Sequence, residues 1–314
     1  MINIEEVADR TFRLEVAIAQ TSWLTTVYFI DNGKGILVEP GPASAIPAIQ
    51  EAMNKLGMKE LSHVIPTHIH LDHAGAIGGL ARLFPQAKVV LHPRAVKHAV
   101  DPSRWIRSTK MSFGDNYDDR YGEILPVPEA QVIAAEDGQI LSVNGRKLQT
   151  IHAPGHASHN IAIFDLETRG LFCGETLGLP PAGANWSPLP AAAPPDFDLE
   201  VYLETMEKLK KLKPAILFYS HDGVGREPQE LITKAAENSR IFGEIILDSL
   251  KQGNSIEEID GKIRDYVNRN LGLNVESGGD PTSNIGAANL DIPEGTDRPT
   301  LDGYISYFKR QELV

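Results

Sequence analysis

The sequence has little cysteine, no long apolar run and no basic leader at its N-terminus. Its single cysteine, Cys173, excludes an intrachain disulfide and any cysteine-rich zinc module. No apolar run reaches the ~20 residues that a helix needs to cross a bilayer, so we expect no membrane partner. Residues 1–6 do not combine a basic segment with an apolar core, so we expect no signal peptide and a cytoplasmic location.

Positive charge is also scarce, which bears on the partners of the protein. The chain has 30 lysine and arginine residues against 42 aspartate and glutamate residues, a formal net charge of −12. This balance repels a phosphate backbone, so we do not expect nucleic acid as a partner. A small-molecule substrate is the expected partner, and the chain is compatible with a homodimer. Its 314 residues are enough for a large core.

Apolar spacing and turn pairs predict a first part that is rich in strands. Asn32-Gly33 and Asn144-Gly145 each separate two apolar runs, and such pairs are typical of two-residue hairpin turns. Apolar residues at helical spacing predict helices over residues 43–57 and 74–84. Gly57 is expected to end the first of them.

The composition changes near Glu227-Pro228. We predict a mixed α/β catalytic domain over residues 1–227 and an α-helical region over residues 228–314. Helices are expected over about 228–252, 255–270 and 300–311, with a long loop over 272–299.

Residues 101–128 interrupt the α/β pattern of the first domain. They hold Trp105, Tyr117 and Tyr121 among charged residues. We interpret this insertion either as a lid over a site or as a surface excursion that packs on its own domain or on a partner subunit.

The densest group of metal-ligating side chains is His68-Ile69-His70-Leu71-Asp72-His73, after the apolar run Val64-Ile65. In an extended chain His68, His70 and Asp72 share a face and His73 points the other way. A turn into a helix near Asp72 would divide the four side chains between two adjacent sites. Imidazoles and a carboxylate are ligands that zinc, iron or manganese accept without any thiolate.

Three later apolar runs also end in candidate ligands. His156 follows Leu148–Ile151, Glu175 follows Leu171–Cys173, and His221 follows Ile216–Tyr219. Sites in α/β proteins gather at the carboxyl ends of strands, so four such ends predict one convergent site.

These residues together resemble the metallo-β-lactamase-fold hydrolase superfamily over residues ~10–222, and its glyoxalase II-like branch in particular. The resemblance implies an α/β fold, an αββα sandwich of two mixed sheets flanked by helices, with an α-helical C-terminal extension. It implies that one metal is held by His68, His70 and His156, and the other by Asp72, His73 and His221. The superfamily usually has Asp as the bridging carboxylate, so whether Glu175 bridges both metals is left open.

Two divalent metal ions, with zinc expected and iron or manganese as alternatives, would generate a bridging hydroxide at neutral pH. This hydroxide would attack an ester-type carbonyl of a thioester or a lactone, with Asp72 as the catalytic residue that orients it and moves its proton. An aromatic lid residue such as Tyr117 or Tyr121 would suit an acyl chain. The alternatives are a mononuclear-iron sulfur dioxygenase and a non-catalytic metal-binding module.

The remaining histidines need a separate interpretation. We expect His63, His92, His98 and His152 to be structural or solvated. His159, three residues after His156, either orients a ligand or contacts substrate, or is a buried hydrogen-bonded histidine.

Overall fold

The computed structural model describes residues 2–21, 23–180, 187–221, 223–271 and 299–314. The chain forms two compact units. The first comprises residues 1–152, 159–174 and 215–224, and the second comprises residues 153–158, 175–214 and 225–314. The loop expected over 272–299 lies outside the described residues, apart from residue 299.

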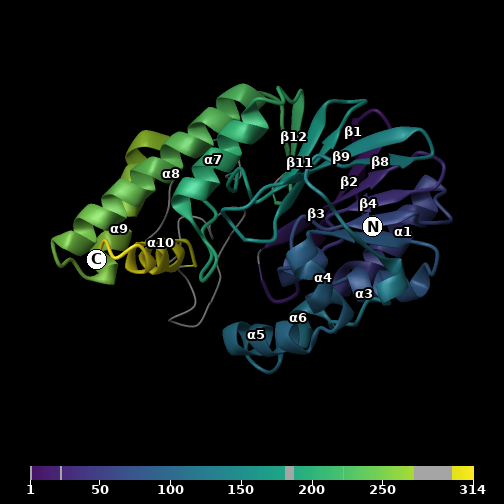
Figure 1. The fold of residues 1–314 in the computed structure, drawn as a ribbon, viewed down its shortest axis with the longest axis horizontal. Helices are drawn as coiled ribbons and strands as arrows, with labels where there is room; N and C mark the ends of the chain where they lie inside the picture. The colour runs from purple at the N-terminus through teal and green to yellow at the C-terminus, as the bar shows by residue number, and fades with distance from the viewer. Residues whose placement is uncertain (1, 22, 181–186, 222, 272–298) are drawn as a thin grey trace. The chain divides into compact units, whose positions relative to one another are not determined.

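The first sheet of the first unit, several of whose strands are labelled in Figure 1, is mixed and has seven strands in chain order. They are β1 (Ile4–Ala8), β2 (Thr11–Ala17), β3 (Leu24–Ile30), β4 (Ile36–Val38), β5 (His63–Ile65), β6 (Lys88–Leu91) and β7 (Val132–Ala134). Strands β1 to β4 pair antiparallel, and β4 to β7 pair parallel. The predicted hairpin at Asn32-Gly33 is confirmed, because it joins β3 and β4.

The second sheet has six strands in the order β13-β12-β11-β10-β9-β8. They are β8 (Ile140–Val143), β9 (Arg146–His152), β10 (Ile161–Asp165), β11 (Gly170–Gly174), β12 (Ile216–Tyr219) and β13 (Val224–Gly225). Asn144 and Gly145, both at positive φ, turn β8 into β9 as predicted. Strands β8 to β11 pair antiparallel, and β11 pairs parallel with β12, so this sheet is also mixed.

Alternating side chains of the first sheet supply two cores. In β3, Tyr28 and Ile30 join Phe172 and Phe218 of the second sheet in one buried cluster. Val27 and Phe29 point the other way, into a cluster that includes residues of helices α1 (Ile46–Leu56) and α3 (Ile77–Leu83). Period-two alternation thus lets one strand serve both a sheet–sheet and a sheet–helix interface. The predicted sandwich of two mixed sheets with helices is confirmed.

The helix predicted over residues 74–84 is α3, and a short helix, α2 (Leu71–Ala74), precedes it. A Cβ on Gly75 would lie 2.6 Å from the Leu71 carbonyl oxygen and 2.9 Å from the Ala43 nitrogen. Neighbouring backbone therefore packs directly on the junction, and α2 ends there. Helix α4 (Pro93–Val100) follows β6.

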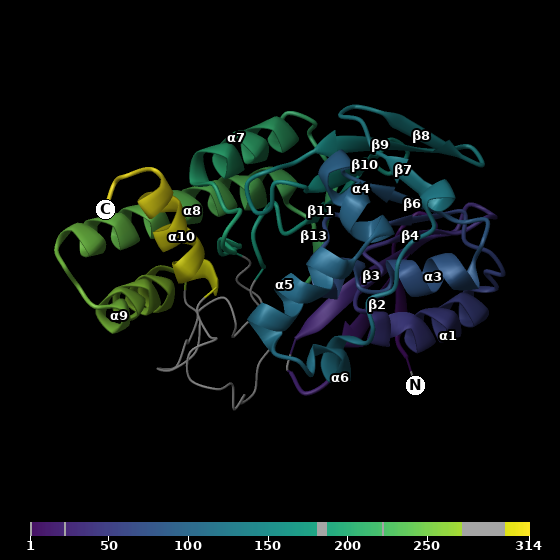
Figure 2. The same cartoon turned by 60° about the horizontal axis from the view of Figure 1, so that its bottom comes forward.

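The insertion forms helices α5 (Ser103–Phe113) and α6 (Tyr117–Tyr121), which lie side by side (Figure 2). Trp105 and Tyr117 are buried in the same core cluster as α1 and α3. The insertion therefore packs on its own unit, and Tyr117 is part of that core. Tyr121 is only partly buried.

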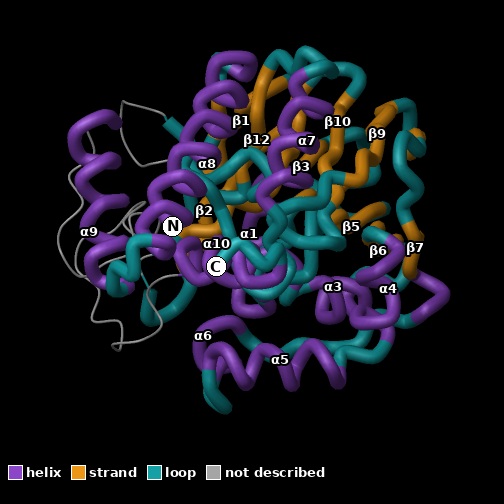
Figure 3. Tube along the Cα trace, turned by 60° about the vertical axis from the view of Figure 1, so that its left-hand side comes forward, coloured by secondary structure: helices purple, strands orange, loops and turns teal. Residues whose placement is uncertain are grey.

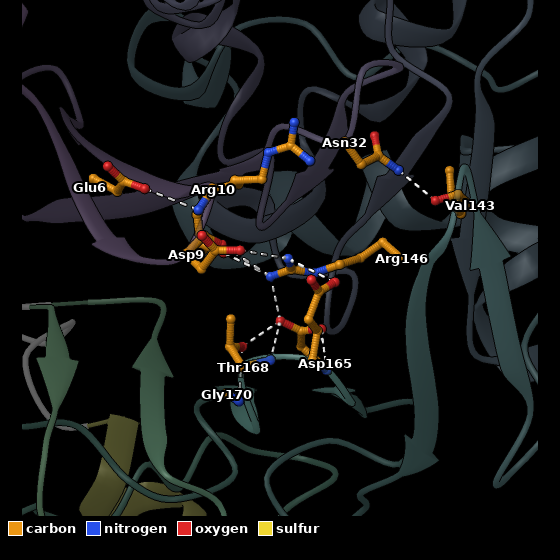
Figure 4. A network of polar contacts seen from close by, with 11 residues as sticks. Glu6, Asp9, Arg10, Asn32, Val143, Arg146, Asp165, Thr168 and Gly170 are labelled. Atoms are coloured by element: carbon orange, nitrogen blue, oxygen red, sulfur yellow. Dashed lines mark hydrogen bonds and ion pairs between the residues drawn. The ribbon is translucent and has the colours of Figure 1, made fainter.

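A buried ion pair ties the start of β9 to the end of β10 (Figure 4). Arg146 donates to Asp165 over 2.6 Å and to the main-chain oxygen of Asp9 over 3.2 Å. Asp165 also accepts from Thr168, whose hydroxyl in turn accepts from the backbone of Gly170. This network satisfies two charges that would be costly to bury alone.

The helices of the second unit are drawn as purple tubes in Figure 3. They are α7 (Leu199–Lys210), α8 (Pro228–Lys251), α9 (Ile256–Tyr266) with a π-helical turn (Val267–Leu271), and α10 (Pro299–Arg310). The Tyr304 hydroxyl of α10 donates to the Ser239 carbonyl of α8, and Tyr266 of α9 donates to Asn238. The helices predicted in the C-terminal region are confirmed. Among the described residues, no helix is both long and apolar enough to cross a membrane.

Candidate metal centre

The histidine-rich motif changes conformation at His70. This residue is extended, with φ −70° and ψ 157°, and α2 begins at Leu71. His68 and His70 therefore share one face, and His68 Nε2 lies 2.8 Å from His70 Nδ1. Asp72 and His73 lie on the following turn of helix, so the motif divides as its spacing predicts.

A group of three side chains, Asp72, His73 and His221, forms within the first unit. Their ligand atoms lie within 4.8 Å of one another. Asp72 Oδ2 is 3.3 Å from His73 Nε2 and 3.4 Å from His221 Nε2. Both imidazoles are buried, whereas the Asp72 side chain is 24% exposed. The structure thus brings together residues that are far apart in the sequence.

The rings of this group are oriented by acceptors on their far side. His221 Nδ1 donates to the Leu24 carbonyl over 2.7 Å, because a carbonyl oxygen can only accept. His73 Nδ1 lies 2.7 Å from Glu39 Oε2. Each contact holds a proton on Nδ1, so Nε2 is the ring nitrogen that faces Asp72 and is available to a cation once it carries no proton.

Glu39, directly after β4, is a residue that the sequence reasoning missed. It is buried at φ +54°, and its second oxygen accepts from the Thr67 backbone N–H over 3.1 Å. One carboxylate therefore holds both the start of the histidine motif and the ring of His73. The same rule that identified the other ligands, a polar residue at the end of an apolar strand, would have identified Glu39.

Two more predicted ligands meet in the second unit. His156 Nε2 lies 2.8 Å from Glu175 Oε2, and both residues are buried. His156 Nδ1 donates to the Ala191 carbonyl over 2.9 Å. This ring is therefore oriented in the same way as His73 and His221, with Nε2 toward a carboxylate.

The electrostatics of the three-residue group favour charge separation. Burial opposes ionisation of Asp72, but His73 and His221 outweigh it and hold the pKa of that carboxyl well below its usual range. Burial likewise opposes protonation of His73, yet Asp72 and Glu39 raise the pKa of its imidazole well above the ordinary value. The two carboxylates thus favour positive charge at this position, as they would favour a bound cation.

The donor set fits a divalent transition metal. Imidazoles with a fixed Nδ1 proton, an ionised carboxylate and no thiolate match zinc, iron or manganese. The ligands also come from separate segments, since Asp72 and His73 belong to one segment and His221 to another. The fold therefore builds this group, as expected for a metal site.

The other histidines occupy different positions. His92 caps α4 by accepting from the Arg94 N–H over 3.1 Å, and His152 Nε2 donates to the Ala135 carbonyl over 2.8 Å. Both therefore have structural contacts, as expected. The His159 ring is stacked 6.3 Å from that of His68, so it lies beside the motif.

Comparison with known proteins identifies the family of this chain. The family model of the metallo-beta-lactamase superfamily matches residues 21–221. A metallo-beta-lactamase fold-containing protein of Sulfurisphaera tokodaii is 25% identical over 205 residues, which are 64% of this chain and 74% of that protein. An atrochrysone carboxyl ACP thioesterase of Aspergillus fumigatus is 24% identical over 221 residues, 69% of this chain but only 56% of the enzyme.

Solved structures show the same fold. A metallo-beta-lactamase family protein from Thermus thermophilus has a TM-score of 0.69 at 17% identity, covering 98% of this chain and 95% of that one. An archaeal superfamily protein from Sulfolobus tokodaii has a TM-score of 0.60 at 22% identity, covering 72% and 84% of the two chains.

Proposed function

Because this chain belongs to the metallo-beta-lactamase superfamily, we propose that it is a metal-dependent hydrolase that cleaves an ester-type carbonyl, in a thioester or a lactone. The observation that carries the proposal is the common orientation of three buried rings. His73, His156 and His221 each have Nδ1 against a protein acceptor and Nε2 against a carboxylate. This arrangement prepares lone pairs for a cation and is typical of metal ligands.

We propose that the ligands form two sets. His68, His70 and His156 would hold one cation, and Asp72, His73 and His221 the other. Glu175, which lies against His156, would supply a further carboxylate. Zinc is the expected metal, because most of these ligands are imidazoles, which are borderline donors that suit zinc.

Bound divalent cations would supply a hydroxide at neutral pH and would polarise the scissile carbonyl. The role of the protein would be to hold the ligands in place before the substrate arrives. Asp72 is the ionised and partly exposed carboxylate of its group, so it would accept a hydrogen bond from the attacking water and pass the proton toward the leaving group. His73 and His221 would keep that carboxylate in position.

A thioester is the favoured substrate of the two. The Aspergillus fumigatus relative carries the name of a thioesterase that acts on an acyl carrier protein, although this chain spans only about half of that enzyme.

The test is metal analysis of the purified protein, combined with assays of a thioester, a lactone and a phosphodiester. We expect two divalent ions per chain and hydrolysis of the thioester or the lactone that His70→Ala abolishes. One iron per chain with oxygen consumption would instead support a dioxygenase. Bound metal without turnover of any substrate would support a binding module, and the absence of metal would contradict the proposal.

A further inference from the structure

The segment that carries His156 is held by helix α7 at several points. The Thr205 hydroxyl donates to the Pro154 carbonyl over 2.7 Å, and the Asp198 N–H donates to the Gly155 carbonyl over 2.9 Å. The Asp198 side chain also caps α7 by accepting from the Val201 N–H. Helix α7 and its N-cap residue are therefore the support on which the His156 segment rests.

Gly155 packs too closely on helix α7 for any side chain to fit at its position. This glycine has φ +129°, and a Cβ at its position would lie 2.4 Å from the Cα of Tyr202. Real side chains do not approach backbone so closely, so only glycine allows this contact. The residue immediately before His156 is thus pressed directly against the backbone of Tyr202.

The Tyr202 hydroxyl connects this support to both predicted ligands of the second unit. The side chain is fully buried, and its hydroxyl donates to the Glu175 carbonyl over 2.9 Å. The same hydroxyl accepts from the Ala191 N–H at 3.4 Å. The carbonyl of Ala191 is the acceptor that orients His156.

We infer that Tyr202 is a positioning residue that sets the separation of His156 and Glu175. This inference rests on the proposed function in one respect, namely that both residues are metal ligands. The hydroxyl contacts the main chain of both Glu175 and Ala191, whereas the Tyr202 backbone supports Gly155. Tyr202 belongs to a capped helix, so its position is fixed. The segments of Gly155, Glu175 and Ala191 are therefore all held against the same rigid residue.

Removal of the hydroxyl would leave the Glu175 carbonyl and the Ala191 N–H without this contact in a buried environment. Both segments would then relax toward other contacts, and the Nε2 of His156 and the Glu175 carboxylate would lose their fixed spacing. Metal affinity depends on such supporting contacts, whose loss typically costs about 10–100-fold.

The experiment compares Tyr202→Phe with Tyr304→Phe in the full-length chain. Tyr304 is a matched control, because it is also fully buried in the second unit and its hydroxyl also donates to a carbonyl, that of Ser239. Both variants should unfold at similarly lower temperatures. Zinc binding, measured by competition with a chromophoric chelator, should be about tenfold weaker for one of two ions in Tyr202→Phe only. Thr205→Val, which removes the donor to Pro154, should act in the same direction.

Equal zinc affinity in the Tyr202→Phe and Tyr304→Phe variants would overturn the inference. Amide hydrogen exchange of the metal-free protein gives an independent test that needs no zinc. Ala191 should exchange faster in Tyr202→Phe and at the wild-type rate in Tyr304→Phe, and unchanged exchange in both would also overturn the inference. A wild-type protein that binds no zinc would instead contradict the proposed function.

Discussion

Replacement of Glu39 by glutamine should weaken metal binding much more than it lowers the stability of the metal-free protein. The amide oxygen can still accept from the Thr67 N–H, as Oε1 does now over 3.1 Å. The amide nitrogen, however, would face His73 Nδ1 at the position where a carboxylate oxygen lies 2.7 Å away. An amide N–H donates, so the imidazole would take the tautomer with its proton on Nε2. That nitrogen would then have no lone pair for a cation.

The expected magnitude follows from this change of tautomer. The metal-free fold keeps its hydrogen bonds, because the Nε2 proton can be donated to Asp72, which lies 3.3 Å away. The free energy of unfolding of the metal-free protein falls only by the difference between a hydrogen bond to a charged group and one to a neutral group, about 1 kcal/mol. Metal affinity should fall by about 10–100-fold, or about 1.4–2.8 kcal/mol.

The assay is zinc competition with a chelator, together with denaturant unfolding of the metal-free protein. Asp165→Asn is the control, since Asp165 is a buried acid whose side chain accepts from Arg146, Glu167 and Thr168. This control should lower stability and leave zinc affinity unchanged, the opposite pattern to Glu39→Gln. A Glu39→Gln variant that binds zinc as tightly as the wild type would refute the assigned orientation of His73.

Three further predictions concern stability. Arg146→Met should lower the free energy of unfolding by about 3–5 kcal/mol, because it leaves Asp165 buried without its partner at 2.6 Å; denaturant unfolding with little loss would contradict a buried pair. Burial and the nearby His152 lower the pKa of His92 to about 4. Between pH 6.5 and 4 the unfolded chain therefore binds a proton that the folded chain does not, and stability falls as the pH falls through this window. His92→Asn keeps an acceptor for the Arg94 N–H and should reduce this decline, measured as Tm against pH beside the wild type. Removal of metal by a chelator should lower the stability by about 2.7 kcal/mol if the free metal was at about a hundred times its dissociation constant, and zinc should restore the Tm.

Much of the fold could be predicted from local pattern. Turn pairs at Asn32-Gly33 and Asn144-Gly145 define hairpins through their own backbone preferences, so neighbouring sequence was sufficient. It was harder to predict which side chains of a strand point to which core. Residues Val27 to Ile30 are all buried, so they form a continuous apolar run without alternation, and only the packing of both sheet faces separates Tyr28 from Phe29.

Some features of the candidate site are visible in the local sequence, whereas others depend on contacts between distant segments. His68 to His73 lie within six positions, so their chemistry is visible in the sequence. Glu39 follows an apolar strand as Glu175 does, so the same rule applied to β4 would have identified it. The acceptors of His221 and His156 are the carbonyls of Leu24 and Ala191, and a backbone carbonyl has no signature in the sequence. Only the folded chain shows which carbonyl faces which ring.

The most direct test of the account is anomalous diffraction from crystals of the protein loaded with zinc. We predict a peak bound by Asp72 Oδ2 and by the Nε2 atoms of His73 and His221, and a second peak that His156 helps to bind. Peaks bound only by other residues, or no peak at these imidazoles at saturating zinc, would contradict the claim that these side chains form a metal centre.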